Sequence, residues 1–144
     1  CNIAALNVSG NKKHFQRCNG MQFLYSILLC NNYPFPATVS NPLSSVYLDD
    51  NLMDTRDLSL FCQALLRRNT AMDNLESLSL NSNPEIYSAQ CMQLLFDSIG
   101  SKCPNLRMLS LRRMTLCNDE IFKIIVQFYR RFGHKTKLKT ISLV

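Results

Sequence analysis

The chain is 144 residues long, with 47% hydrophobic residues, 18% charged residues and a formal net charge of +6. These values are ordinary for one globular domain. The apolar runs 23–30 and 121–132 are interrupted by polar residues and fall short of the roughly 20 residues that span a bilayer, so we expect no membrane-spanning segment.

One apolar pattern, apolar-x-x-apolar-x-apolar, occurs five times along the chain. The copies begin at positions 3, 43, 75, 106 and 138, at intervals of 40, 32, 31 and 32 residues. Self-similarity at a nearly fixed period indicates stacked structural units. The five copies are Ile3-x-x-Leu6-x-Val8, Leu43-x-x-Val46-x-Leu48, Leu75-x-x-Leu78-x-Leu80, Leu106-x-x-Leu109-x-Leu111 and Leu138-x-x-Ile141-x-Leu143.

The first two units are predicted to contain a strand followed by a helix. In the first unit the helix covers about 18–30, where apolar residues recur at helical spacing. The segment 31–42 contains three prolines and three asparagines and is predicted to be a loop inserted before the second strand, which explains the longer first interval. In the second unit, Asp54 or Thr55 is predicted to cap the helix.

The later units follow the same plan. In the third, turn residues at 81–84 follow the strand, and a helix is predicted to begin after Ser88 and to end at Gly100. In the fourth, Asn118 is predicted to cap a helix over 119–132, with acidic residues at its start and arginines at its end.

Repeated strand–helix units require parallel strands joined by right-handed crossovers. We therefore expect an α/β solenoid, shaped as a horseshoe arc, with about five short strands on its concave face and about four helices on its convex face. Residues 1–144 are predicted to form a single domain. We expect it to be part of a longer array, because neither outer unit has the polar cap that terminal repeats carry.

The units resemble leucine-rich repeats, and their length and full helix resemble the ribonuclease-inhibitor-like subclass. Asn11, Asn51 and Asn83 follow the pattern at the expected place in three units, whereas Met114 stands there in the fourth. The stretch from Cys103-Pro104-Asn105-Leu106 to Leu116-Cys117-Asn118-Asp119-Glu120 also resembles the cysteine-containing repeats of F-box proteins. The GTPase-activating domain of the nuclear-transport GTPase shares the long repeat, but no residue of its active region can be carried over.

The cysteines and the missing catalytic motifs limit the chemistry. Seven cysteines stand singly, as buried thiols do and as disulfide frameworks do not, so we expect an intracellular, reducing compartment. The sequence contains no Cys-x-x-Cys or His-x-x-x-His spacing of the kind that binds a metal ion, so we expect no metal or cofactor. The chain has no Gly-x-Ser-x-Gly elbow and no phosphate-binding glycine loop, so we expect a protein that is not an enzyme.

The predicted concave face carries mostly small polar side chains. Tyr47 is the aromatic exception and a candidate contact residue, although aromatic residues in such places more often only shield the sheet from water. Acidic residues mark the second unit and arginines the fourth; this indicates either a polarised binding face or a solvated rim. The candidate partner-binding residues on this face are Tyr47, Asp49, Ser79, Asn81, Met108, Ser110, Arg112 and Arg113.

The C-terminal part of the chain is basic. Residues 102–144 contain ten Lys or Arg and two acids, a net charge of +8, whereas residues 1–101 contain six and eight, a net charge of −2. Arg130, Arg131 and Lys135 are candidate contacts for an acidic partner surface, although cations are also usual at a helix end.

These observations favour a non-catalytic scaffold that binds another protein through the concave face and the basic C-terminal flank. The alternatives are a substrate-receptor module of a ubiquitin ligase and, less favoured, a GTPase-activating or nucleic-acid-binding domain. The oligomeric state is left open by the sequence.

Overall fold

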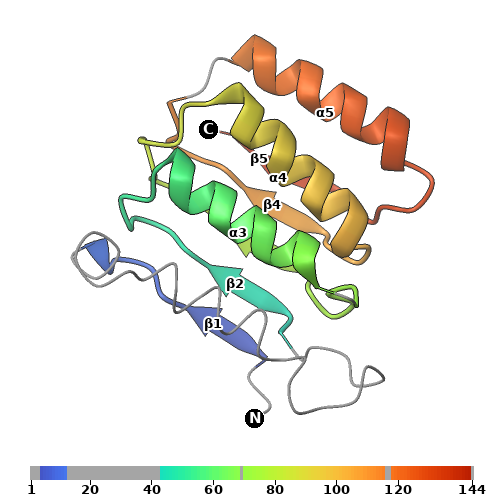
Figure 1. The fold of residues 1–144 in the computed structure, drawn as a ribbon, viewed down its shortest axis with the longest axis horizontal. Helices are drawn as coiled ribbons and strands as arrows, with labels where there is room; N and C mark the ends of the chain where they lie inside the picture. Colours follow the sequence, from blue (N-terminus) through green and yellow to red (C-terminus); the bar gives the residue numbers. More distant parts are fainter. Residues whose placement is uncertain (1–3, 13–42, 69, 116–117, 144) are drawn as a thin grey trace.

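The structure is a computed structural model that describes residues 4–12, 43–68, 70–115 and 118–143. Five short strands form one parallel sheet in the order β1-β2-β3-β4-β5 (Figure 1). The predicted parallel α/β architecture with five strands is therefore confirmed. The strands are β1 Ala5–Asn7, β2 Ser45–Tyr47, β3 Ser77–Ser79, β4 Met108–Ser110 and β5 Thr140–Ser142.

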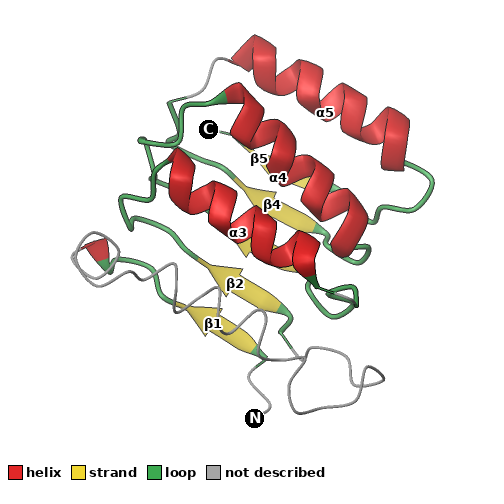
Figure 2. Ribbon diagram, viewed as in Figure 1, coloured by secondary structure: helices red, strands yellow, loops and turns green. Residues whose placement is uncertain are grey.

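Three helices lie side by side on one side of the sheet (Figure 2). They are α3 Thr55–Arg67, α4 Ala89–Lys102 and α5 Asn118–Phe132, with α4 packed between the other two. The expectation of about four helices differs from the three in the part of the chain that the structure describes. The helix predicted for 18–30 and the loop predicted for 31–42 lie outside the described residues.

The middle residue of each strand packs against the helices. Val46, Leu78 and Leu109 are paired in register across β2, β3 and β4, and none is more than 1% exposed. The helices contribute Leu58, Leu95 and others to the same hydrophobic core. Burying such side chains stabilises the fold by about 1.5–3 kcal/mol each, so the apolar period of the sequence accounts for the register of the sheet.

The helix starts follow the predicted caps. Asp54 caps α3 in a capping box, in which its side chain accepts from the amide of Asp57 while the Asp57 side chain accepts from the amide of Asp54. The Ser88 hydroxyl accepts from the amide of Cys91 at the start of α4. Both predicted caps are confirmed.

The predicted end of α4 at Gly100 is wrong, because the helix continues to Lys102. Gly100 is in contact with the ring of Phe132, and a Cβ at this position would overlap that ring. The glycine therefore permits the close approach of α5 and does not terminate the helix.

Buried asparagines join the turns of neighbouring units. Asn83, which is fully buried, accepts at its Oδ1 from the amides of Asn51 (3.1 Å) and Met53 (3.0 Å). Its Nδ2 donates to the carbonyl oxygens of Leu48 (3.0 Å) and Leu80 (2.9 Å). One side chain therefore satisfies backbone groups in two successive turns, which would otherwise be buried without partners.

A left-handed residue recurs at the same place after four of the strands. The residue three positions after the strand end has a φ between 53° and 75° in each case. Left-handed backbone costs little for glycine and more for residues with a Cβ. These residues are Gly10, Asp50, Ser82 and Arg113.

Candidate interaction surface

The sheet face opposite the helices carries the strand residues on either side of the buried middle positions. Tyr47 and Met108 are half-buried there, in β2 and β4. Ser79 and Ser110 lie in the same register row as Tyr47 but are only 4% and 8% exposed. The two bulky side chains are thus the more accessible of the four predicted contacts on the strands.

Side-chain acceptors also connect the turns that follow the strands. Asp49 Oδ1 accepts from the Ser79 hydroxyl (2.5 Å) and from the amide of Asn81 (2.7 Å). Asn81 Oδ1 accepts in the same way from the Ser110 hydroxyl (2.7 Å) and from the amide of Arg112 (2.7 Å). These bonds fix the turns relative to one another, and they use one oxygen of each predicted binding residue internally.

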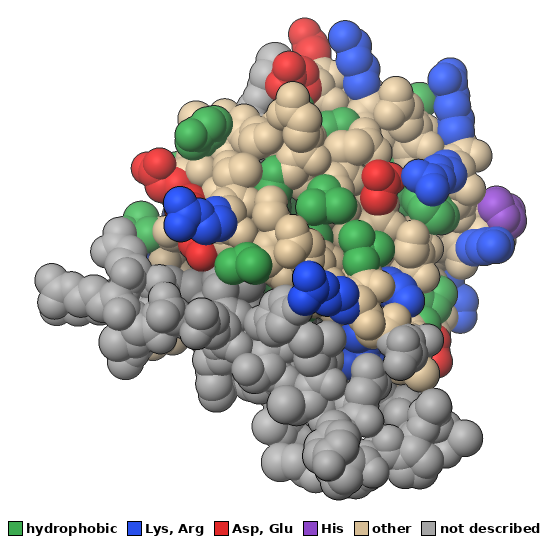
Figure 3. Space-filling view, viewed as in Figure 1, with side chains coloured by type: hydrophobic (Ala, Val, Ile, Leu, Met, Phe, Trp, Pro, Cys, Tyr) green, Lys and Arg blue, Asp and Glu red, His purple; other side chains and the backbone are tan. Residues whose placement is uncertain are grey.

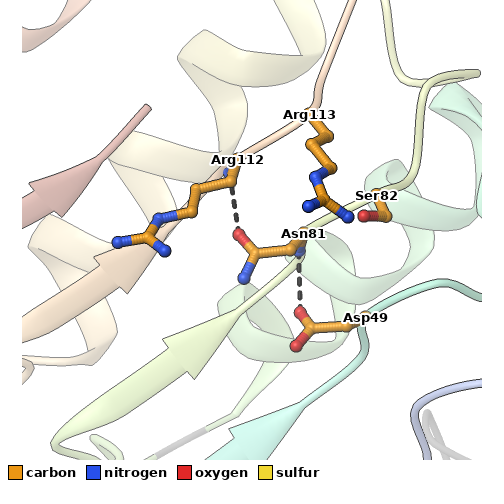
Figure 4. A pocket seen from close by; sticks show the side chains of 5 residues that line it. All are labelled: Asp49, Asn81, Ser82, Arg112 and Arg113. Atoms are coloured by element: carbon orange, nitrogen blue, oxygen red, sulfur yellow. Dashed lines mark hydrogen bonds between the residues drawn. The ribbon is translucent and has the colours of Figure 1, made fainter. Parts of the chain in front are cut away.

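A pocket of about 420 Å³ lies over these turns, lined by Asp49, Asn81, Ser82, Arg112 and Arg113. Figure 4 shows the side chain of Arg113 extending towards Ser82, whereas that of Arg112 points away from Asp49. Both arginines are exposed, and no carboxylate among the described residues pairs with either guanidinium. The structure thus brings four predicted residues (Asp49, Asn81, Arg112 and Arg113) into one pocket.

At the end of the sheet where these turns lie, the charge changes sign between the turn after β2 and the turn after β4. Asp50 is paired with Lys12 at 2.9 Å, so its charge is partly compensated. The Asp49 carboxylate is held by hydrogen bonds to neutral groups. Arginines occupy the turn after β4, and this edge of the sheet is therefore acidic at β2 and basic at β4.

The other predicted basic residues lie at the opposite end of the sheet. Arg130 and Arg131 are in the last turn of α5, and Lys135 lies just beyond it. The helices run antiparallel to the strands, so the end of α5 adjoins the start of β5 and is remote from the turns that follow β2 and β4 (Figure 1). Arg131 is also engaged within the chain, by an ion pair with Asp97 at 3.4 Å.

The described cysteines are buried thiols. Cys62, Cys91 and Cys103 are free and at most 4% exposed, as expected of the singly spaced cysteines in the sequence. Removal from water disfavours the thiolate and raises the pKa of Cys62 and of Cys103 to about 12. Such thiols are poor nucleophiles at neutral pH, and no group of three or more potential metal ligands occurs among the described residues.

The sequence analysis did not predict the left-handed residue that follows four of the strands, nor the hydrogen bonds that Asp49 and Asn81 accept within the chain. The sequence does contain a signal for both: residues that tolerate positive φ, or that have a short polar side chain, recur at equivalent positions in successive units.

Among the helices of the described residues, none has the length and apolar character needed to span a bilayer.

Comparisons of the chain with protein-family models, curated proteins and solved structures found no match.

Proposed function

We propose that the chain is a leucine-rich-repeat solenoid of the ribonuclease-inhibitor-like subclass, acting as a non-catalytic scaffold for another protein. The partner binds the sheet face that carries no helices, together with the adjoining turns. The observation that carries the proposal is the pocket over these turns, where Arg112 and Arg113 are exposed and have no carboxylate partner among the described residues. An acidic group on a partner protein would complement them.

The hydrogen bonds beneath this pocket support a binding role. Asp49 and Asn81 hold the turns after β2, β3 and β4 in one arrangement before any partner arrives. A preformed surface loses little conformational entropy when it binds. Tyr47 and Met108, half-buried on the neighbouring strands, would provide apolar contact area beside the charged pocket.

The basic residues at the end of α5 contribute in this proposal only if the partner extends along the full length of the strands. The buried free thiols of Cys62, Cys91 and Cys103 are consistent with a reducing, intracellular environment. The proposed partner is a protein with an acidic surface.

The test is an affinity capture from lysate with two charge-matched variants. Arg112→Glu with Arg113→Glu removes the cations at the pocket, and Arg130→Glu with Lys135→Glu makes the same charge change at the other end of the sheet. A partner that is captured by the wild type and the second variant, but not by the first, would support the proposal. A partner that is lost only with the second variant would contradict it.

Binding to polyanions provides a further check on the nature of the partner. If the pocket served nucleic acid, affinity for an oligonucleotide would fall steeply with salt concentration, with a slope that tracks the number of phosphates contacted. We expect no such binding by the wild type above the level shown by the Arg112→Glu, Arg113→Glu variant.

A further inference from the structure

The face of the sheet away from the helices carries a row of short polar side chains on β3. Ser77 and Ser79 belong to the strand, and Asn81 continues the row in the turn that follows. The register places Tyr47 beside Ser79 on β2 and Met108 beside Ser77 on β4, and both of these longer side chains are half-buried. The row, which we call the β3 strip (Ser77, Ser79 and Asn81), therefore lies between two longer side chains.

The β3 strip belongs to the inner part of the sheet. β3 is paired with β2 on one side and with β4 on the other, so its open face is not an edge. The three helices of the described residues all pack on the opposite side of the sheet (Figure 2). Neighbouring strands lie about 4.8 Å apart, so the backbones of β2 and β4 are about 10 Å apart across the strip. That width is enough for a single extended chain.

The strip leads into the pocket that contains the two arginines. Asn81, its last residue, lines this pocket, and its Oδ1 accepts from the amide of Arg112 (Figure 4). The amide of Asn81 donates to Asp49 Oδ1, so Asp49 lies beside the strip on the β2 side and Arg112 on the β4 side. The Nδ2 of Asn81 has no partner among the described residues. It is therefore a donor, like Arg112 and Arg113, that a ligand in the pocket could use.

Charged residues border the strip at both ends. The pocket lining contains two arginines and one carboxylate, Asp49, which accepts hydrogen bonds from within the chain. At the other end, Glu76 and Arg107 precede β3 and β4 at adjacent register positions, and Lys139 lies one strand further from β3. Cations thus border the β4 side of the strip at both ends, which favours an acidic ligand.

The helix side of the molecule carries mixed charges instead. Figure 3 views the molecule from that side, where acidic and basic side chains lie next to one another over the described helices. A surface with interspersed charges of both signs is typical of a solvated face. The strip and its pocket are therefore the better candidate for an acidic ligand.

The hydroxyl groups on this face suit an extended backbone. Ser45 and Ser77 are half-buried in one register row, and neither hydroxyl has a hydrogen-bond partner among the described residues. A serine hydroxyl can both donate and accept, and an extended chain presents backbone groups that need such partners. A helix has its backbone bonded internally and is about 10–12 Å wide, so it would rest on the two longer side chains and leave the hydroxyls beneath it unpaired.

We infer that the partner binds through an extended acidic segment that lies along the β3 strip. The inference rests on the proposed function and names the part of the partner that makes the contact. The segment passes between Tyr47 and Met108, with its backbone polar groups at the serine hydroxyls. From Ser77 to Asn81 an extended chain covers about 13 Å, so about five residues of the partner are in contact.

One acidic side chain of this segment enters the pocket. Arg112, Arg113 and the Nδ2 of Asn81 are the donors that a carboxylate would meet there. Charge-assisted hydrogen bonds of this kind are stronger than those between neutral groups. The pocket therefore fixes one end of the segment, and the strip aligns the rest.

The experiment selects peptides from a phage library of random sequences of about ten residues, twice the expected contact length. The library is selected on the wild-type chain and, in parallel, on the Arg112→Glu, Arg113→Glu variant, and both pools are sequenced. Peptides enriched on the wild type are expected to share an Asp or Glu. Their affinity, measured by fluorescence polarisation, should be weaker for the double variant on the order of a hundredfold.

Two tryptophan variants test the strip itself. Ser77→Trp places a large side chain in the path of the segment and should weaken the selected peptides on the order of tenfold. Thr140→Trp is the matched control, because Thr140 is exposed in the same register row but two strands away, on β5. It should bind as the wild type does. Met108→Ala adds no bulk and should weaken binding about fivefold through lost apolar contact, so it decides the matter if Ser77→Trp does not fold.

A proline scan of one selected peptide tests its conformation. Proline disrupts a helix at any interior position, whereas in an extended chain it removes one donor and keeps the backbone extended. The N–H groups of an extended chain point alternately to opposite sides. Binding should therefore fall at the positions whose N–H meets the serine hydroxyls and persist at the positions between them.

The inference and the proposed function would fail in different ways. Selected peptides that bind the Arg112→Glu, Arg113→Glu variant as tightly as the wild type would contradict both. Peptides that need the arginines but tolerate Ser77→Trp and Met108→Ala, or that lose binding at every interior proline, would overturn only the inference. The absence of any peptide enriched on the wild type would also overturn it, while the capture from lysate would still test the proposed function.

Discussion

Replacing Asn83 by alanine should destabilise the protein far more than the same change at Asn51, although both side chains are fully buried at equivalent positions. In Asn83→Ala the amides of Asn51 and Met53 lose their acceptor, and the carbonyl oxygens of Leu48 and Leu80 lose a donor. A buried polar group without a partner costs about 1–3 kcal/mol, and with two donors and two acceptors affected we expect a loss of about 4 kcal/mol.

The expected loss of stability at Asn51 is smaller because that side chain makes fewer hydrogen bonds. Among the described residues, its Oδ1 accepts only from the amide of Asn11 (2.7 Å), and its Nδ2 has no partner. Asn51→Ala removes this unpaired group together with one hydrogen bond, so we expect a cost of about 1 kcal/mol or less.

Urea unfolding followed by circular dichroism would measure both variants against the wild type. The midpoint should fall for Asn83→Ala with an unchanged slope, and the melting temperature should drop by about 15 °C, at about 4 °C for each kcal/mol in a chain of this size. Equal losses in the two variants would refute the reasoning, because burial alone would then decide the cost.

Three further predictions concern backbone conformation, helix packing and pH. Arg113→Gly should stabilise the fold by about 1 kcal/mol, because φ is 56° at this residue, whereas Arg112→Gly should not; a lower urea midpoint for Arg113→Gly would contradict this. Gly100→Ala should destabilise the fold by about 1–3 kcal/mol, because the added Cβ overlaps Phe132. Alanine at an unobstructed helix position would instead stabilise the fold, so a higher melting temperature would contradict the overlap. For Cys62 and Cys103, the folded-state pKa is raised from 9.0 to about 12, so the unfolded chain loses these thiol protons first and the free energy of unfolding should fall as pH rises from about 9 to about 12. The decline should be shallower in Cys62→Ala with Cys103→Ala, by up to about 1.4 kcal/mol per pH unit for each thiol, and equal slopes would show that the thiols do not contribute.

The strand positions and helix caps could be predicted from the sequence because they depend on local spacing. The apolar period placed Val46, Leu78 and Leu109 on one face, and the caps at Asp54 and Ser88 follow from the side chains that can accept from the first helical amides. The prediction that α4 ends at Gly100 was wrong because a glycine is compatible with a helix end and also with close packing between helices. Only the position of Phe132 distinguishes the two.

The candidate site was predictable as a set of residues but not as an arrangement. Asp49 and Asn81 were recognised as polar residues after a strand, but their hydrogen bonds reach residues about 30 positions away, which local spacing does not reveal. The separation of Arg130 from Arg112 follows from the direction of the helices. Charge counted along the sequence places the two in one cluster, whereas the fold places them at opposite ends of the sheet.

The hydrogen bonds between successive turns run in both directions along the sheet. Asn83 accepts from amides of the preceding unit, whereas Asp49 and Asn81 accept from amides of the following one. The amides of Asn51 and Met53 can therefore exchange with deuterium only when the turn after β3 moves away, even though they belong to the unit before it. Their protection factors report the opening of a neighbour, and the amide of Arg112 likewise reports on the unit that contains Asn81. Hydrogen exchange measured at these few sites would reveal whether the chain opens from the β1 side, from the β5 side or as a single unit.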